Sequence, residues 1–576
     1  MITPCVRSLR RMRRSPSVAL GGERYGSLGA PDSGGRVVGR SAARWCLAVL
    51  LLVPFHGRAA AQHDEHAAMP AGFDDPIPLY TVGLGSFTRR IMTTSREAQA
   101  YFNQGIQFLY AFTPLDAARS FREAWKRDPQ CAMCYFGEAW AWGPYLNGDM
   151  KPDDAPRAWA AIQQAKKLAP GHATAAERDM IEAMAVRYEL KHDTLRRERL
   201  DTVYAAAMLK AYRAHPADLD AGTLAAEALM LVQPRQGTWD IDDPAVIEIH
   251  TLLEGLLALD IGHPGACHLY VHATESTTKP GKAEACADHL GNSIPGASHI
   301  NHMPSHTYNR VGRWGDAVRA NLQAWHSDMK AAIGEGFAIY PSHNLHMLLF
   351  AASFDGQGAI AIQAGKDYRK VQGGGDYYHT LTLFRFGRFD ELLALPVTRS
   401  SNPIFNGFTD FGRGYAHLRT GRPDSARSYL AHLDSIATGS PESANFRGHP
   451  AAQMLGVVGG ILRGEIQRAD GDLAGAVASL EKAVAIEDGI RYDEPEPLNF
   501  SARHWLGAAL LEADRPQDAE RVYNEELGHH PRNGWSLFGL EQALRVQGRV
   551  FEANEAHRRF EEAWARSDTW IRASRF

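Results

Sequence analysis

The sequence lacks long apolar runs and contains only six cysteines. No stretch of the chain after residue 61 approaches about 18 uninterrupted apolar residues, so we expect no stable membrane insertion. The chain has 576 residues, of which 45% are hydrophobic and 22% charged. This length exceeds a single ordinary domain, and the apolar content suffices for a large buried core.

Several short catalytic motifs are also absent. The chain has no H-E-x-x-H zinc-protease motif, no G-x-S-x-G nucleophile elbow and no glycine-rich phosphate loop. The pair Cys131-x-x-Cys134 is not followed by histidine, which excludes covalent haem attachment at this motif. We therefore expect neither a bound nucleotide nor covalent haem.

Lysine is missing from residues 1–61, which contain ten arginines and two acidic residues. Without this segment the chain has 52 basic and 64 acidic side chains, a formal net charge of −12. Nucleic acids and anionic lipids are bound by basic patches, so we expect neither as a partner. A negative mature chain instead attracts cations.

The order of residue types in this segment is typical of a targeting signal. Arginines precede an apolar run at 46–55, and three alanines ending at Ala61 precede Gln62. A run of about 10 residues is too short to span a bilayer. The pattern predicts a signal peptide cut near Ala61/Gln62 and a periplasmic or secreted protein. Residues 1–35 exceed what a signal needs, and they are either the product of an upstream start codon or a real extension.

Four cysteines remain after such processing. An even number in an oxidising compartment suggests disulfides. Cys131 and Cys134 fit a local disulfide, a redox pair or half of a zinc site, and we favour a structural disulfide. Cys267 and Cys286 are candidates for a second disulfide across one helical hairpin.

A period of 34 residues organises the chain. Counted from Ala98 as position 1, positions 8, 11, 20, 24, 27 and 32 are occupied by Gly105, Phe108, Ala117, Phe121, Ala124 and Pro129. These are the small, large apolar and proline positions of a tetratricopeptide repeat (TPR), and the match is specific because all six agree. Further units start at 407, 457, 500 and 534.

Each such unit predicts a helical hairpin that cannot bury its apolar face alone. We therefore predict an all-α fold, a TPR-like right-handed α-solenoid of helical hairpins with a concave groove and no strands. The predicted segments are a signal or targeting segment (1–61), an N-terminal arm on the first repeat (62–95), an N-terminal TPR (96–145), degenerate helical repeats (146–260), a histidine-rich TPR core (261–372), TPR repeats (373–490) and C-terminal TPR repeats (491–576).

Histidines concentrate in the middle repeats, where eleven of the 25 lie between His250 and His346. With Ala283, Ala317 and Ala361 at position 20 of three units, histidines occupy positions 2, 5 and 9, and a glutamate occupies position 12. These positions share one stripe of the first helix of each hairpin, which faces the groove in TPR proteins. Three helices thus present seven histidines and one glutamate to one concavity.

This arrangement predicts a metal site. The pairs His268/His272 and His302/His306 have the i, i+4 spacing that places two nitrogens on one ion. Clustered neutral imidazoles are a poor peptide clamp, because Lys and Arg bind carboxylates better, and protonated imidazoles repel one another. A transition metal removes both difficulties. The candidate ligands are His263, His268, His272, Glu275, His299, His302, His306, His343 and His346.

The ligand types suit copper, iron or zinc. More than four candidates would overfill one tetrahedral zinc, which indicates a dinuclear centre or one ion with supporting histidines. His263 lies at a helix entry and fits either role. A groove that binds a peptide or acidic ligand without metal, and purely structural histidines, are the alternatives.

Three functions follow from such a site. The first is a scaffold whose concave groove binds a protein, peptide or small ligand beside the metal. The second is a metal-dependent oxidoreductase or hydrolase in which Glu275 acts as general base. The third is periplasmic metal storage or delivery. The residues alone leave the choice among them open.

Several segments resemble a group of bacterial exported TPR proteins. The similar motifs are HPGACHLYVHATE at 263–275, HMPSH at 302–306, VGRWGDA at 311–317, CAMCYFG at 131–137, YDEP at 492–495 and NGWSLFGL at 533–540. The resemblance covers most of residues 95–570 and implies the fold and export, but no particular reaction. Small residues are expected in that group where this chain has Cys267 and Cys286, which implies a disulfide specific to this protein.

Overall fold

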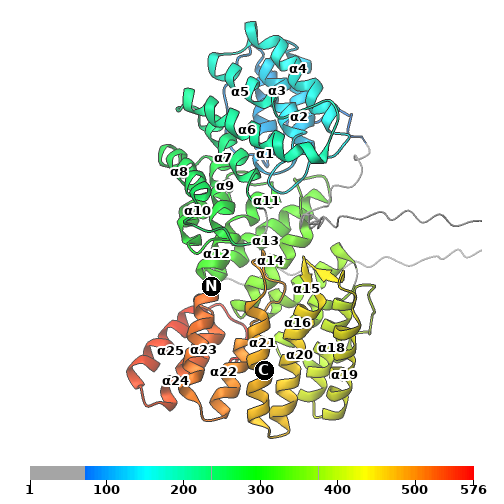
Figure 1. The fold of residues 1–576 in the computed structure, drawn as a ribbon, viewed down its shortest axis with the longest axis vertical. Coiled ribbons are helices and arrows are strands. Elements are labelled where there is room, and N and C mark those ends of the chain that lie inside the picture. Colours follow the sequence, from blue (N-terminus) through cyan, green and yellow to red (C-terminus); the bar gives the residue numbers. More distant parts are fainter. Residues whose placement is uncertain (1–71, 235–236, 374) are drawn as a thin grey trace, which may run out of the picture. The chain divides into compact units, whose positions relative to one another are not determined.

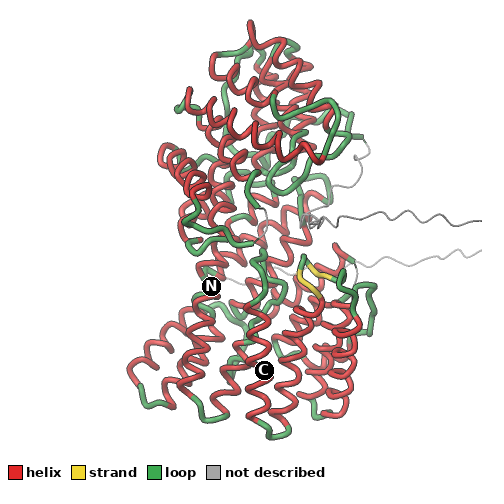
Figure 2. Tube along the Cα trace, in the orientation of Figure 1, coloured by secondary structure: helices red, strands yellow, loops and turns green. Residues whose placement is uncertain are grey.

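The computed structural model describes residues 72–234, 237–373 and 375–576. The predicted signal segment and its cleavage site lie outside these residues. The described part is all-α apart from one short hairpin of strands β1 (Asn445–Phe446) and β2 (His449–Pro450) (Figures 1 and 2). Two strands of two residues each are too short to leave an alternating pattern, so the expectation of no strands was wrong at this hairpin.

The helices follow one another with mostly short connections. Those before residue 260 are α1 (Arg96–Tyr110), α2 (Pro114–Arg127), α3 (Ala132–Ala141), α4 (Ala155–His172), α5 (Ala175–Ala185), α6 (Thr194–Ala214), α7 (Leu219–Leu231) and α8 (Pro244–Leu259). The middle ones are α9 (Pro264–Glu275), the 3₁₀ turn η1 (Pro280–Ala283), α10 (Glu284–Leu290), α11 (Ser298–His302), α12 (Pro304–Val311), α13 (Trp314–Ala331), α14 (Pro341–Phe354), α15 (Gly358–Gln372), α16 (Tyr377–Arg385) and α17 (Phe389–Ala394). The last are α18 (Pro403–Arg419), α19 (Pro423–Gly439), α20 (Ala451–Ala469), α21 (Leu473–Asp488), α22 (Arg503–Glu512), α23 (Pro516–His529), α24 (Gly534–Val546) and α25 (Val550–Trp564).

Neighbouring helices pack through small residues at close crossings. A Cβ atom at Gly105 or Gly137 would lie 2.7 or 2.4 Å from the ring of Phe121, so this ring on α2 fits only between glycines on α1 and α3. Tyr523 on α23 is held in the same way between α22 and α24. Each aromatic ring therefore joins two successive hairpins. The described chain is a TPR-like solenoid of helical hairpins, as the repeat predicts.

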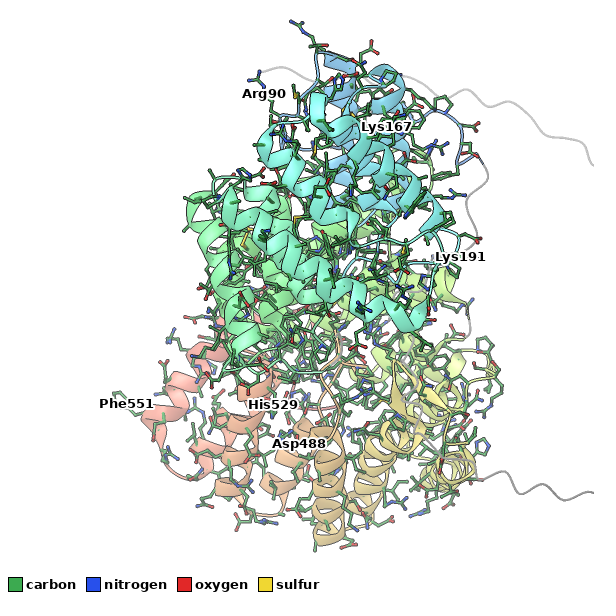
Figure 3. All side chains as sticks on the ribbon, turned by 45° about the horizontal axis from the view of Figure 1, so that its top comes forward. Arg90, Lys167, Lys191, Asp488, His529 and Phe551 are labelled. Carbon is green, nitrogen blue, oxygen red and sulfur yellow. A yellow bond between two sulfur atoms is a disulfide. The ribbon has the colours of Figure 1, made fainter. Side chains whose placement is uncertain are left out.

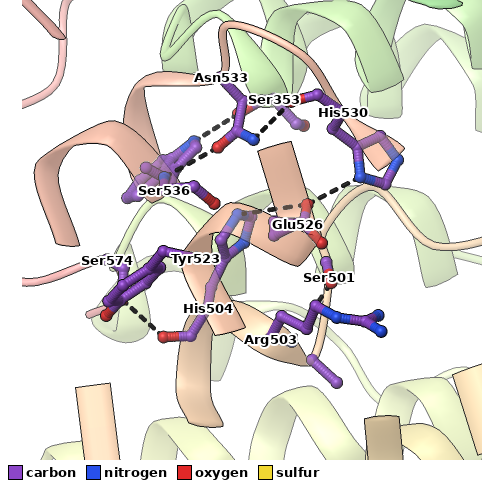
Figure 4. Close-up of polar contacts among 12 residues, drawn as sticks. Ser353, Ser501, Arg503, His504, Tyr523, Glu526, His530, Asn533, Ser536 and Ser574 are labelled. Atoms are coloured by element: carbon purple, nitrogen blue, oxygen red, sulfur yellow. Dashed lines mark hydrogen bonds and ion pairs between the residues drawn. The ribbon is translucent and has the colours of Figure 1, made fainter. Parts of the chain in front are cut away.

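The C-terminal helices share a buried polar network (Figure 4). The carboxylate of Glu526 lies 2.7 Å from Nδ1 of His530 and 3.7 Å from Nε2 of His504. The side chain of Asn533 donates to the carbonyl of His530 over 2.8 Å and accepts from the Ser536 amide at the start of α24. These contacts link α22, α23 and α24 through buried polar side chains.

The last helix exposes its outer face. Phe551 at the start of α25 is 93% exposed (Figure 3). None of the helices in the described ranges is long and apolar enough to cross a lipid bilayer.

One predicted helix is interrupted. The repeat predicts a single helix over 298–311, but the structure divides it into α11 and α12 at Pro304. Proline lacks the amide proton that would continue the hydrogen-bond ladder. Met303 nevertheless keeps helical dihedral angles, so side chains on either side of Pro304 stay on one face.

Both candidate cysteine pairs are joined. Cys131 and Cys134 lie three residues apart at the start of α3, and their sulfur atoms are 2.06 Å apart. Cys267 on α9 is bonded to Cys286 on α10, with their Cα atoms 5.0 Å apart and a sequence separation of 19. The second disulfide therefore ties the first histidine-bearing helix to the helix that packs against it.

The two disulfides should differ in their contribution to stability. The longer loop restricts the unfolded chain more, so we expect replacement of both Cys267 and Cys286 by serine to lower the free energy of unfolding by about 3 kcal/mol, against about 2 kcal/mol for Cys131 and Cys134. Urea unfolding followed by circular dichroism measures both values. If the two losses in free energy of unfolding are equal, or if the loss is larger without Cys131 and Cys134, the Cys267–Cys286 disulfide does not stabilise the fold by restricting the unfolded chain.

Candidate metal centre

Four helices bring the predicted ligands together in the middle of the chain (Figure 1). Helix α9 carries His268, His272 and Glu275, α11 and α12 carry the histidines of the next unit, and α14 carries His343. Helix α12 packs on α9, and α14 packs on α11. Every one of these side chains is buried, and the most exposed, His272, is only 8% exposed.

The six histidines form two groups of three. Ligand atoms within each group all lie within 4.8 Å of one another, and a third, overlapping group contains two carboxylates. The first group, called triad one, consists of His268, His272 and His299. The second, called triad two, consists of His302, His306 and His343. The third group consists of His272, Glu275, His306 and Glu494.

In each triad two Nε2 atoms face each other. The distance is 3.1 Å between Nε2 of His268 and Nε2 of His299, and 3.0 Å between those of His302 and His306. Two nitrogens bound to one ion at about 2.0–2.1 Å lie roughly 2.9–3.4 Å apart. Both pairs therefore have the separation of ligands that share a metal ion.

In two of these rings, Nδ1 faces an acceptor. Nδ1 of His268 lies 2.7 Å from the carbonyl oxygen of Tyr110, which can only accept a hydrogen bond. Nδ1 of His302 lies 3.3 Å from Oδ1 of Asn321, and the amide group of Asn321 is oriented by donation to the carbonyl of Ala317. These contacts place the proton on Nδ1 and leave the lone pair on Nε2.

Glu275 connects the two triads. Its Oε1 accepts from Nδ1 of His272 over 2.7 Å, and its Oε2 accepts from Nδ1 of His306 and from the hydroxyl of Tyr492. Burial raises the pKa of Glu275, but the adjacent His306 and His272 outweigh it and hold that pKa well below its usual range. Both imidazoles consequently direct Nε2 away from the carboxylate.

A loop from the C-terminal half completes the centre. Oε2 of Glu494 lies 3.0 Å from Nδ1 of His306, and Arg447 holds the preceding Asp493 through two hydrogen bonds of 2.6 and 2.8 Å. Burial and the charge of Glu275 raise the pKa of Glu494 to about 7. Glu494 was not among the site residues predicted from the sequence, although it lies in the YDEP motif at 492–495.

Strained aromatic residues surround triad one. Phe112 and Tyr340 have φ values of 57° and 60°, in the left-handed region that bulky residues rarely adopt. The ring of Phe112 lies 4.2 Å from that of His268, and the ring of Tyr340 lies 5.5 Å from that of His299. Arg447, which holds the C-terminal loop, also has a positive φ. Such conformations cluster at functional sites because the surrounding packing enforces them.

A pocket leads to the carboxylate side of the centre. It reaches His272, Glu275 and Glu494, and its outer wall includes Trp239 and Arg491. Nε2 of His272 is buried and has no hydrogen-bond partner among the described residues. A small molecule in this pocket would therefore contact His272 and the two carboxylates.

Two predicted ligands, His263 and His346, lie outside all three groups. Nδ1 of His263 accepts from the amide of Ala266 and caps α9, while its Nε2 lies 3.4 Å from Oδ1 of Asp220. Nε2 of His346 lies 2.5 Å from the hydroxyl of Tyr378. Neither ring belongs to a group of converging ligand atoms within the described chain.

Comparison with known proteins gives only remote likenesses. No protein-family model matches the chain, and no curated protein sequence matches it significantly. The solved structures that align include a human IFIT1 dimer with m7Gppp-AAAA (12% identity, 82% of this chain and 92% of that chain, TM-score 0.29), the APC/C hetero-tetramer Cut9–Hcn1 (11%, 84% and 77%, 0.27) and the P58(IPK) TPR domain (12%, 78% and 98%, 0.22). At these identities and TM-scores, the ligands of those proteins say nothing about this chain.

Proposed function

We propose that triads one and two hold a dinuclear transition-metal centre, and that the protein is a metalloprotein that binds or transforms a small molecule there. The observation that carries this proposal is the pair of facing Nε2 atoms in each triad, 3.1 and 3.0 Å apart and buried. In triad two, Asn321 and Glu275 hold the protons of both rings on Nδ1, so both facing Nε2 atoms carry lone pairs and repel unless a cation lies between them.

That cation is either a proton or a metal ion. A proton satisfies two nitrogens, and the neighbouring carboxylates do raise the pKa of His306 to about 10 against the opposing effect of burial. A proton leaves the third ring of each triad unexplained. In triad one, Nε2 of His272 converges on the same space and has no hydrogen-bond partner there. Three converging imidazoles are the donor set of a metal ion.

In this proposal Glu275 supports the ligands and does not bind the metal as the sequence suggested. Its oxygens are engaged by Nδ1 of His272, Nδ1 of His306 and the hydroxyl of Tyr492. This is the carboxylate–histidine–metal arrangement, which fixes the ring orientation and makes Nε2 more basic. The same engagement argues against a role for Glu275 as general base. Glu494 lies 3.0 Å from Nδ1 of His306 and so supports the same ring on the side away from its Nε2.

Access to the centre favours chemistry or ligand exchange over storage. The pocket lined by Trp239 and Arg491 reaches His272 and the two carboxylates. A bound copper or iron would supply redox chemistry, and a bound zinc would activate water for hydrolysis. The predicted signal peptide adds that the centre functions in the periplasm or outside the cell, where the concave face would also be available to a protein or peptide partner.

Metal content tests the proposal directly. We expect mature protein purified from rich medium to contain ~2 transition-metal ions per chain. The variants His268→Ala and His302→Ala should each retain about one, and the double variant should retain none. Mass spectrometry of the purified proteins measures these values. The matched control is His326→Ala, which removes an exposed histidine of α13.

Absence of metal from the wild-type protein, both as isolated and after addition of copper, iron and zinc salts, would refute the centre. Retention of two ions by the double variant would refute the assigned ligands. The metal identity separates the two enzyme classes, since copper or iron favours an oxidoreductase and zinc a hydrolase.

The supporting role of Glu275 gives a separate prediction. The substitution Glu275→Gln leaves only one acceptor oxygen for two imidazole N–H groups, so we expect metal affinity to fall about 10- to 100-fold while the stoichiometry at saturation stays the same. Competition with a chelator measures the affinity. Glu248→Gln, at an exposed position on α8, is the control, and lost stoichiometry in Glu275→Gln would instead show direct ligation.

A further inference from the structure

The arm of the chain, residues 77–92, has no helix or strand and packs on α1. Three glutamines of α1 each form two hydrogen bonds with the backbone of the arm. Gln104 accepts from the amide of Tyr80 and donates to the carbonyl of Pro78, over 2.9 and 3.0 Å. Gln107 does the same with Gly85 and Phe87, over 2.7 and 2.9 Å.

The third glutamine holds the end of the arm. Gln99 donates to the carbonyl of Arg89 over 2.8 Å and accepts from the amide of Ile91 over 3.1 Å. Gln99 and Gln107 lie eight residues apart, two steps of the i, i+4 spacing, and so share one stripe of α1. This face of α1 is therefore filled by the chain itself and is closed to an external peptide.

Arg89 of the arm bonds two aspartates at the start of α7. Nη1 and Nη2 of Arg89 donate to the carboxylate of Asp218 over 2.6 and 2.7 Å. Nη1 also donates to Oδ2 of Asp220 over 2.8 Å. All three side chains are at most 15% exposed. Charge-assisted bonds at this burial are strong, and removing one partner leaves a poorly solvated charge.

From Asp220 a chain of contacts leads to triad one. The hydroxyl of Tyr110, the last residue of α1, donates to Oδ1 of Asp220. The carbonyl oxygen of the same Tyr110 accepts from Nδ1 of His268. The Tyr110 ring also fits against Gly265 of α9, where a Cβ atom would lie 2.4 Å from it. Tyr110 is thus fixed at its hydroxyl, at its ring and at its carbonyl.

We propose that the arm positions the metal ligand His268, with Arg89 acting through Asp220 and Tyr110. The inference rests on the proposed metal centre. Arg89 and Asp220 fix the Tyr110 side chain, and the fixed end of α1 aims the Tyr110 carbonyl at Nδ1 of His268. The ring then presents Nε2 to triad one. Arg89 is a positioning residue and contacts neither the metal nor its ligands.

Copper(II) titration of metal-free protein tests this role. We expect Arg89→Gln to bind one of its two copper ions about 3- to 10-fold more weakly, less than loss of a direct ligand partner would cause, and to change the visible and electron paramagnetic resonance spectra of that ion alone. Arg89→Lys should recover part of the affinity, because it keeps the charge without the two-pronged geometry.

The matched control is Arg122→Gln. Arg122 bonds Asp74, which directly precedes the arm, over 2.8 Å. This ion pair does not involve Asp220 or Tyr110, so its loss should leave both copper ions unchanged. Tyr110→Phe removes only the hydroxyl bond to Asp220 and provides a second variant if Arg89→Gln does not fold. We expect it to change the same copper spectrum.

The outcomes separate the two proposals. Wild-type protein that binds no copper, iron or zinc refutes the metal centre and this inference with it. Wild-type protein that binds two copper ions, with Arg89→Gln or Tyr110→Phe showing the same affinity and spectra, refutes the positioning role alone. Equal weakening by Arg122→Gln would also refute it, because the effect would then come from general loosening of the arm.

Discussion

Close packing of successive helices is the constraint on which the centre depends. Phe121 fits between Gly105 and Gly137, where any side chain would collide with the ring. The same crossing recurs around Tyr523. Such crossings set the spacing of neighbouring hairpins, and imidazoles on adjacent helices approach to about 3 Å only when the backbones are this close.

Burial of the triad histidines has an electrostatic cost, which hydrogen-bond acceptors next to the rings partly offset. The rings of triads one and two are almost fully removed from water. Acceptors at Nδ1, supplied by Tyr110, Asn321 and Glu275, fix the protons on one side of their rings and concentrate lone pairs on the other. Lone pairs that face one another at about 3 Å repel, and a cation between them removes this cost, which is why we propose metal ions there.

The parts that hold the site come from distant regions of the chain. Tyr492 contacts Glu275 across 217 residues of sequence, and Tyr110 contacts His268 across 158. The arm adds Arg89 from before the first helix. A solenoid in which each hairpin touched only its neighbours would not need such contacts. Here the loop at 491–496 and the arm at 77–92 both contribute to the surroundings of one centre.

The sequence by itself determined the all-α repeat fold and the six histidines of the triads, because a fixed 34-residue period places equivalent residues on equivalent helix faces. It also contained the YDEP segment without indicating its place. Only the tertiary structure decided that His263 caps a helix, that His346 bonds Tyr378, and that Glu275 and Glu494 face Nδ1 of His306. Periodicity specifies the direction of a side chain from its own helix, whereas rotamers and partners depend on segments far away in sequence.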